Sequence, residues 1–166
     1  SSPHISPKST TQKLMLDVII ALVPTVIASV VLYGFYPLFL LILSVGTAVF
    51  SEWAFNTIAK RPNSTRDLSA IVTGMIFALC LPPVVPFYVA IVGAAFAIII
   101  VKMLFGGIGR NFANPAVTAR IFVMLCWAGV MTKFVAPIDL SDGANLFSYF
   151  THAVNINLPD AITTAT

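Results

Sequence analysis

Five apolar runs, each near the length of a bilayer crossing, constrain the fold of this chain more than any other feature. A helix rises about 1.5 Å per residue, so about 20 apolar residues cross the hydrocarbon core of a bilayer, which is ~30 Å thick. The runs cover residues 14–33, 37–59, 68–81, 87–105 and 115–135. Only 9% of the 166 residues are charged, and the mean hydropathy is +0.97, whereas a soluble domain carries about 25% charged residues. We therefore predict an all-α integral membrane protein with about five transmembrane helices.

The third run is the weakest candidate for a full crossing. It spans residues 68–81 and is stopped by Pro82 and Pro83. At about 1.5 Å per residue it is too short to cross the bilayer alone. We expect a short helix, broken or re-entrant, whose extended end is buried in protein. At the start of the fifth run, Asn114 is the expected N-cap and Pro115 the first helical residue.

The charges between the runs indicate an orientation if all five runs cross. Basic residues precede the first run and follow the second and the fourth, namely Lys8, Lys13, Lys60, Arg61, Arg66 and Arg110. The positive-inside rule places these segments in the cytoplasm, and the acidic tail after the fifth run then lies outside. We predict a cytoplasmic tail at 1–13, membrane helices at 14–135 and an extracytoplasmic segment at 136–166. No cleavage pattern follows the first run, so we expect it to remain as a span.

Several functional classes are excluded by the small number of charges and cysteines. A net charge of +3 cannot form the basic stripe that nucleic-acid binding requires, so no nucleic-acid partner is expected. Cys80 and Cys126 lie in different apolar runs, and an iron–sulfur cluster takes four thiolates. We interpret both as buried free thiols and expect no metal site.

Glu52 is the residue most costly to place in a bilayer. It lies about two turns before the end of the second run, and a carboxylate at the centre of a membrane helix costs about 2.5–3.5 kcal/mol on insertion scales. Lys102 and Arg120 are expected at a similar depth near the same face, where either could compensate the charge. Two interpretations stay open: a structural ion pair between helices, and a carboxylate that lines an ion or proton path.

Glycines mark two further features. Residues 105–116 carry three glycines and Arg110 before the expected cap at Asn114, which could present N–H groups to an anion. Composition favours a tight cytoplasmic turn instead. Gly74 and Gly93, within the third and fourth runs, are interpreted as points of close helix contact.

Four stretches in chain order resemble the RnfD/NqrB family of membrane subunits. They are Ser1-Ser-Pro-His4, Asp67-Leu-Ser-Ala-Ile-Val-Thr-Gly74 with Leu81-Pro-Pro83, Phe105-Gly-Gly-Ile-Gly with Asn114-Pro-Ala116, and Asp160-Ala-Ile-Thr-Thr-Ala-Thr166. In that family the closing motif carries flavin mononucleotide (FMN) as a phosphoester of its final threonine, which is Thr166 here. Thr164 stands where the family most often has glycine. Whether a second, non-covalent flavin is bound is left open by the resemblance.

The resemblance implies a membrane subunit of an ion-translocating ferredoxin:NAD oxidoreductase, the Rnf complex, which is not a complete enzyme alone. Its covalent FMN would relay electrons while Na⁺ or H⁺ crosses the bacterial or archaeal inner (cytoplasmic) membrane. The implied partners are RnfA, RnfB, RnfC, RnfE and RnfG, together with membrane lipid. We expect the chain to form the first half of an inverted-repeat subunit. From the residues alone, a cofactor-free membrane transporter or channel half is the alternative.

Overall fold

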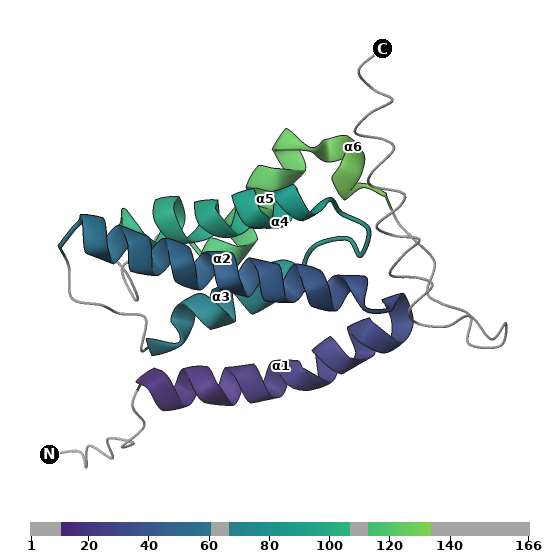
Figure 1. The fold of residues 1–166 in the computed structure, drawn as a ribbon, viewed down its shortest axis with the longest axis horizontal. Helices are drawn as coiled ribbons and strands as arrows, with labels where there is room; N and C mark the ends of the chain where they lie inside the picture. The colour runs from purple at the N-terminus through teal and green to yellow at the C-terminus, as the bar shows by residue number, and fades with distance from the viewer. Residues whose placement is uncertain (1–10, 61–66, 107–112, 134–166) are drawn as a thin grey trace, which may run out of the picture.

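Helices form all the regular structure in the part of the chain that the computed structural model describes, which is residues 11–60, 67–106 and 113–133. In chain order they are α1 (Thr11–Tyr33), α2 (Tyr36–Ile58), α3 (Ser69–Leu79), α4 (Phe87–Phe96), the π-helix η2 (Ala97–Met103), α5 (Pro115–Cys126) and α6 (Ala128–Met131). In Figure 1, α2 runs through the middle, with α3 and α1 on one side and α4 and α5 on the other. α2 contacts α1, α3, α4 and η2.

The helices differ in whether they are long enough to span a bilayer. α1 and α2 have 23 residues each and are long and apolar enough to cross a membrane. α3 has 11 residues, which gives a helix only about 17 Å long, so the expectation of a short third helix is confirmed. The helical stretch 87–103 and α5 are also shorter apolar helices.

The fifth helix is not continuous, contrary to the expectation of one helix from 115 to 135. α5 ends at Cys126 because Trp127 leaves the helical region, with φ −131° and ψ 49°. The Trp127 ring packs edge-on against Tyr88 of α4, with 6.0 Å between ring centroids. The short α6 then begins at Ala128, and residues 134–135 lie outside the described residues.

Local signals at Gly34 and Asn114 set two of the helix ends. Gly34 adopts φ 79° and donates its N–H to the Val30 carbonyl at 2.9 Å, which is the left-handed cap that ends many helices. At the start of α5, the Asn114 side-chain oxygen accepts the Ala116 N–H at 3.0 Å. The predicted N-cap at Asn114 is therefore confirmed.

Small residues allow the helices to approach closely. A Cβ added to Gly74 would lie 2.8 Å from the Val45 Cα of α2, and the Ser44 hydroxyl donates to the Gly74 carbonyl at 3.0 Å. Gly93 of α4 faces the Phe77 ring of α3, which a Cβ at that position would overlap. The interpretation of both glycines as close helix contacts is confirmed.

The described helices are apolar outside and carry polar groups inside. Ile42 and Phe50 of α2 are 62% and 63% exposed, and α1 contributes no buried residue. The buried polar side chains are those of Ser44, Ser51, Glu52, Asn56, Ser69, Thr73 and Lys102. Water would penalise such an apolar surface, whereas lipid would not, so the arrangement suits a membrane protein.

Candidate functional site: a buried carboxylate–ammonium pair

One face of α2 places the carboxylate of Glu52 in the interior. Every fourth residue from the start of the helix is buried, in the order Tyr36, Leu40, Ser44, Ala48, Glu52 and Asn56. Residues four apart share a helix face, so this stripe points inward along the whole helix. After Ala48 both of its members, Glu52 and Asn56, are polar. The Glu52 side chain is fully buried there.

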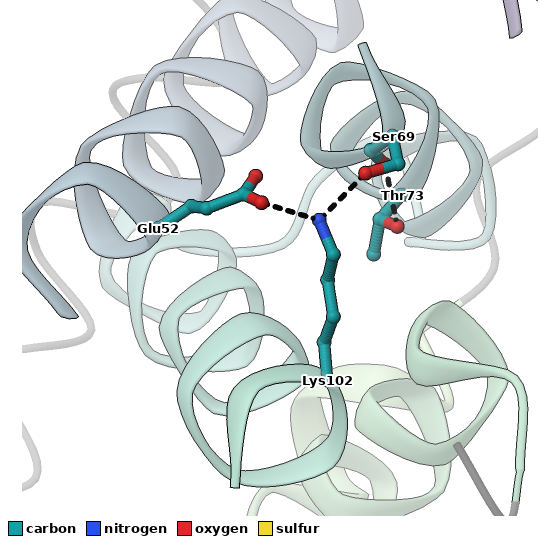
Figure 2. A network of polar contacts seen from close by, with 4 residues as sticks. All are labelled: Glu52, Ser69, Thr73 and Lys102. Carbon is teal, nitrogen blue, oxygen red and sulfur yellow. Dashed lines mark hydrogen bonds and ion pairs between the residues drawn. The ribbon is translucent and has the colours of Figure 1, made fainter. Parts of the chain in front are cut away.

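The charge of Glu52 is balanced by Lys102, which comes from η2. The Lys102 ammonium lies 2.9 Å from Glu52 Oε1, and the lysine side chain is 2% exposed. In Figure 2 the lysine stem rises from its helix and its ammonium lies between α2 and α3. A basic partner for Glu52 was expected, and of the two candidates Lys102 is the one that pairs with it.

Ser69 completes the site, although the sequence pattern did not single it out. The Lys102 ammonium donates to Ser69 Oγ at 2.7 Å, and Thr73 Oγ1 donates to the Ser69 carbonyl at 2.8 Å. Figure 2 shows these contacts gathered at the beginning of α3. The available signal was two hydroxyl residues one turn apart at the start of an otherwise apolar helix.

Two departures from regular backbone geometry adjoin the pair. Lys102 lies in a π-helix that ends with the Leu104 N–H donating to the Ile99 carbonyl at 3.2 Å. π-helical turns are rare in proteins, and those that occur are often found at functional sites. Leu68, directly before Ser69, has φ 59°. A left-handed conformation costs a residue other than glycine about 1–2 kcal/mol. Unusual backbone therefore adjoins both the ammonium and the hydroxyl that accepts from it.

Arg120 does not contribute to this site, contrary to expectation. It lies on the exposed side of α5, while the carboxylate is paired with Lys102. The depth of a residue in a helix does not fix the direction in which its side chain points. Arg120 follows the buried Ala119 by one position, and one position turns a helix by about 100°.

The two cysteines are not part of the Glu52–Lys102 site. Cys80 is half-buried and Cys126 is exposed, both as free thiols, so the expectation of burial is wrong for Cys126. Within 11–60, 67–106 and 113–133, no group of three or more His, Cys, Asp or Glu could hold a metal. Thr166, Asp160 and the predicted turn around Arg110 lie outside the described residues.

The arrangement provides an oxygen-lined position for a positive charge among buried side chains. A carboxylate oxygen and a hydroxyl oxygen face the same point from α2 and α3. At low local dielectric, such a carboxylate is stable only when it is neutralised. The lysine ammonium supplies the neutralising charge in this structure.

Similarity to known proteins extends over the whole chain. The model of the NQR2, RnfD, RnfE family matches residues 1–166. The chain belongs to this family. Among family members, a subunit of the Na(+)-translocating ferredoxin:NAD(+) oxidoreductase complex of Acetobacterium woodii is 42% identical over 142 residues, which are 86% of this chain and 44% of that protein.

Two further family members are named as subunits of an ion-translocating oxidoreductase complex. The protein from Yersinia enterocolitica is 37% identical over 84% of this chain and 40% of its own length. The protein from Vibrio cholerae is 36% identical over 85% of this chain and 41% of its own length. The chain therefore spans less than half the length of these relatives.

Proposed function

We propose that this chain is part of a membrane subunit of an ion-translocating ferredoxin:NAD oxidoreductase, acting with the other Rnf subunits and not as a complete enzyme alone. Its family membership and the names of its relatives support this assignment. The observation that carries the ion-translocating role is the buried Glu52–Lys102 pair. Ionisable groups inside a membrane protein are costly and are concentrated on ion and proton paths.

In this proposal Glu52 lies on the path of Na⁺ or H⁺. Both ions neutralise a carboxylate, and Glu52 is surrounded by further polar groups on the buried stripe of α2. Neighbouring Ser51 and Asn56 are buried too, so the polar part of the stripe extends over more than one turn. A continuous set of polar groups is what an ion needs to leave water.

Thr166 is proposed to carry FMN through a phosphoester bond to its hydroxyl. A threonine hydroxyl is an alcohol that a phosphate can esterify, so the residue type fits the group. A bound flavin accepts and passes one or two electrons. The tether prevents loss of the cofactor from a site that is open to water.

The topology completes the proposal. We propose about five membrane crossings, the third made by the short α3 together with the Pro-rich segment at its end, with the amino-terminal tail in the cytoplasm and Thr166 on the extracytoplasmic side, the chain being the first half of an inverted repeat. The two full-length helices and the apolar outer surface support membrane insertion. The basic residues near Lys60 support the side assigned to the cytoplasm.

The test of the ion path is Glu52→Gln in the intact complex, reconstituted or studied in membrane vesicles. The substitution keeps the side-chain size and removes the charge. We expect electron-transfer-driven uptake of Na⁺ or H⁺ to fall at least tenfold. The measurements are ion uptake and electron transfer with reduced ferredoxin and NAD.

The matched control is Asp17→Asn. Asp17 lies on the exposed side of α1, so the same chemical change there should leave ion uptake within twofold of the unsubstituted complex. Full cation-coupled turnover in Glu52→Gln would remove Glu52 from the path.

A further inference from the structure

The Lys102 ammonium lies where a transported cation would bind. Its nitrogen is 2.9 Å from Glu52 Oε1 and 2.7 Å from Ser69 Oγ, which are a carboxylate and a hydroxyl oxygen. Oxygen atoms of this kind are the ligands that hard cations take in proteins. A lysine ammonium is a compact point charge, so it can substitute for such a cation without rearranging the oxygens.

Stability alone does not explain the pair. Replacing a buried ion pair by apolar residues of similar volume is often neutral or stabilising. The chain nevertheless holds both charges in its interior, with exposures of 0% for Glu52 and 2% for Lys102. It also holds Leu68 at φ 59° and Lys102 in a π-helix, and both features carry a conformational cost. Three costly features that meet at one point indicate a function rather than a scaffold role.

We infer that Lys102 is a built-in competitor for the coupling cation, so that its ammonium and the cation exclude one another at Glu52. This inference rests on the proposed role of Glu52 in the ion path. In the observed state the lysine neutralises the carboxylate, and the position is closed to Na⁺. The cation enters when the lysine side chain withdraws along its flexible four-carbon stem. The competitor prevents the carboxylate from collecting cations between turnovers.

The test removes the competitor and asks whether the carboxylate then binds an external cation. Lys102→Met keeps a long unbranched side chain without the charge. We expect the subunit, within the detergent-solubilised complex, to gain resistance to heat when Na⁺ replaces choline at equal ionic strength. The readout is the temperature at which the subunit leaves the soluble fraction, followed by immunoblot. A second series varies pH in choline alone and so separates proton binding from Na⁺ binding.

Two controls define the expected pattern. The unsubstituted complex should need at least tenfold more Na⁺ than Lys102→Met for the same stabilisation, because its lysine occupies the position. Glu52→Gln/Lys102→Met removes both charges and should respond neither to Na⁺ nor to protonation at this carboxylate. An assembled Lys102→Met complex whose heat resistance depends on neither Na⁺ nor pH overturns the inference.

Lys102→Met leaves a buried carboxylate unbalanced, which can prevent assembly. Lys102→Arg then carries the test, because it keeps both charges and the planar guanidinium can hold a carboxylate with two parallel hydrogen bonds. We expect this stronger competitor to raise the half-saturating concentration of the coupling cation for electron transfer about threefold or more. An unchanged or lower value overturns the inference. The heat measurement requires no turnover, so the two proposals are tested separately. A Lys102→Met complex that does not respond to cations contradicts the competitor role of Lys102, whereas unimpaired ion uptake in Glu52→Gln contradicts the proposed role of Glu52 in the ion path.

Discussion

At the scale of single residues, the cost of burying a charge determines which side chains must have a partner in the interior. Glu52 and Lys102 come from segments 50 residues apart and meet in an interior that is otherwise largely apolar. Each charge alone would be strongly disfavoured there, since an unpaired buried ion costs several kcal/mol. That Glu52 has a basic partner was therefore predictable from the sequence, because a membrane helix rarely retains a carboxylate without one, but the choice of Lys102 over Arg120 was not.

The rest of the site was less accessible to prediction at this scale. A hydroxyl such as that of Ser69 can satisfy itself on its own helix, so its presence in an apolar run does not demand a partner. Arg120 and Lys102 share a depth but not a direction, and depth alone is what the sequence indicates. The direction of a side chain around its helix axis depends on packing, which the apolar pattern of a membrane helix specifies weakly.

The covalent flavin is a prediction for a single hydroxyl. Tryptic peptides of the full-length subunit should carry the mass of FMN on Thr166, and the denatured band should fluoresce under ultraviolet light. Thr166→Val should abolish both signals, because a phosphoester needs the hydroxyl oxygen. Thr163→Val is the matched control and should retain both. An adduct found on Thr163, or none in a host able to attach flavin, contradicts the assignment.

At the scale of the elements, proline and glycine made the helix ends predictable. The end of the first helix at Tyr33 and the cap at Asn114 lie where the sequence indicated, because each depends on local conformational preferences. The π-helix η2 and the break at Trp127 were not predictable. Each depends on what the helix packs against, as the contact between Trp127 and Tyr88 illustrates.

The contact between α2 and α3 gives a prediction on helix packing. Gly74→Ala would bring a Cβ to within 2.8 Å of the Val45 Cα, and backbone cannot move aside as a flexible side chain can. We expect the substitution to lower the free energy of unfolding by about 1–3 kcal/mol. The measurement is the midpoint of unfolding of the full-length subunit in mixed detergent micelles.

Gly46→Ala is the matched control for this contact. Gly46 lies on α2, and a Cβ there meets nothing within 4 Å. Alanine favours a helix over glycine by about 1 kcal/mol, so the midpoint should stay the same or rise. Equal losses in the two variants would show that the glycine at 74 is not needed for close approach.

At the scale of the whole molecule, the distribution of polarity matches a bilayer rather than water. Apolar side chains cover the outside of α1 and α2, whereas the buried stripe of α2 carries Ser44, Glu52 and Asn56. The sequence made this class of fold predictable through run length and the scarcity of charge. It did not fix which residues face inward, since every face of these helices is rich in apolar residues.

The proposed orientation can be measured on the whole molecule in intact cells. In a full-length subunit whose cysteines, Cys80 and Cys126 included, are replaced by alanine, a membrane-impermeant maleimide should label Ser148→Cys and leave Ser64→Cys unlabelled. The reason is that the basic segment containing Ser64 is assigned to the cytoplasm. After lysis both variants should react, which controls for reactivity. Labelling of Ser64→Cys in intact cells would show that the segment containing Ser64 lies outside the cytoplasm, contrary to the proposed orientation.

The central position of α2 limits how this protein can change its length. The helix has one face that must remain inside, with Glu52, and another that carries Phe50 and Trp53 outward. One extra residue in its middle would rotate everything after it by about 100°, so the carboxylate would turn toward lipid. Insertions and deletions are therefore excluded from the body of α2, and relatives should vary in length only at its ends and in the connecting loops.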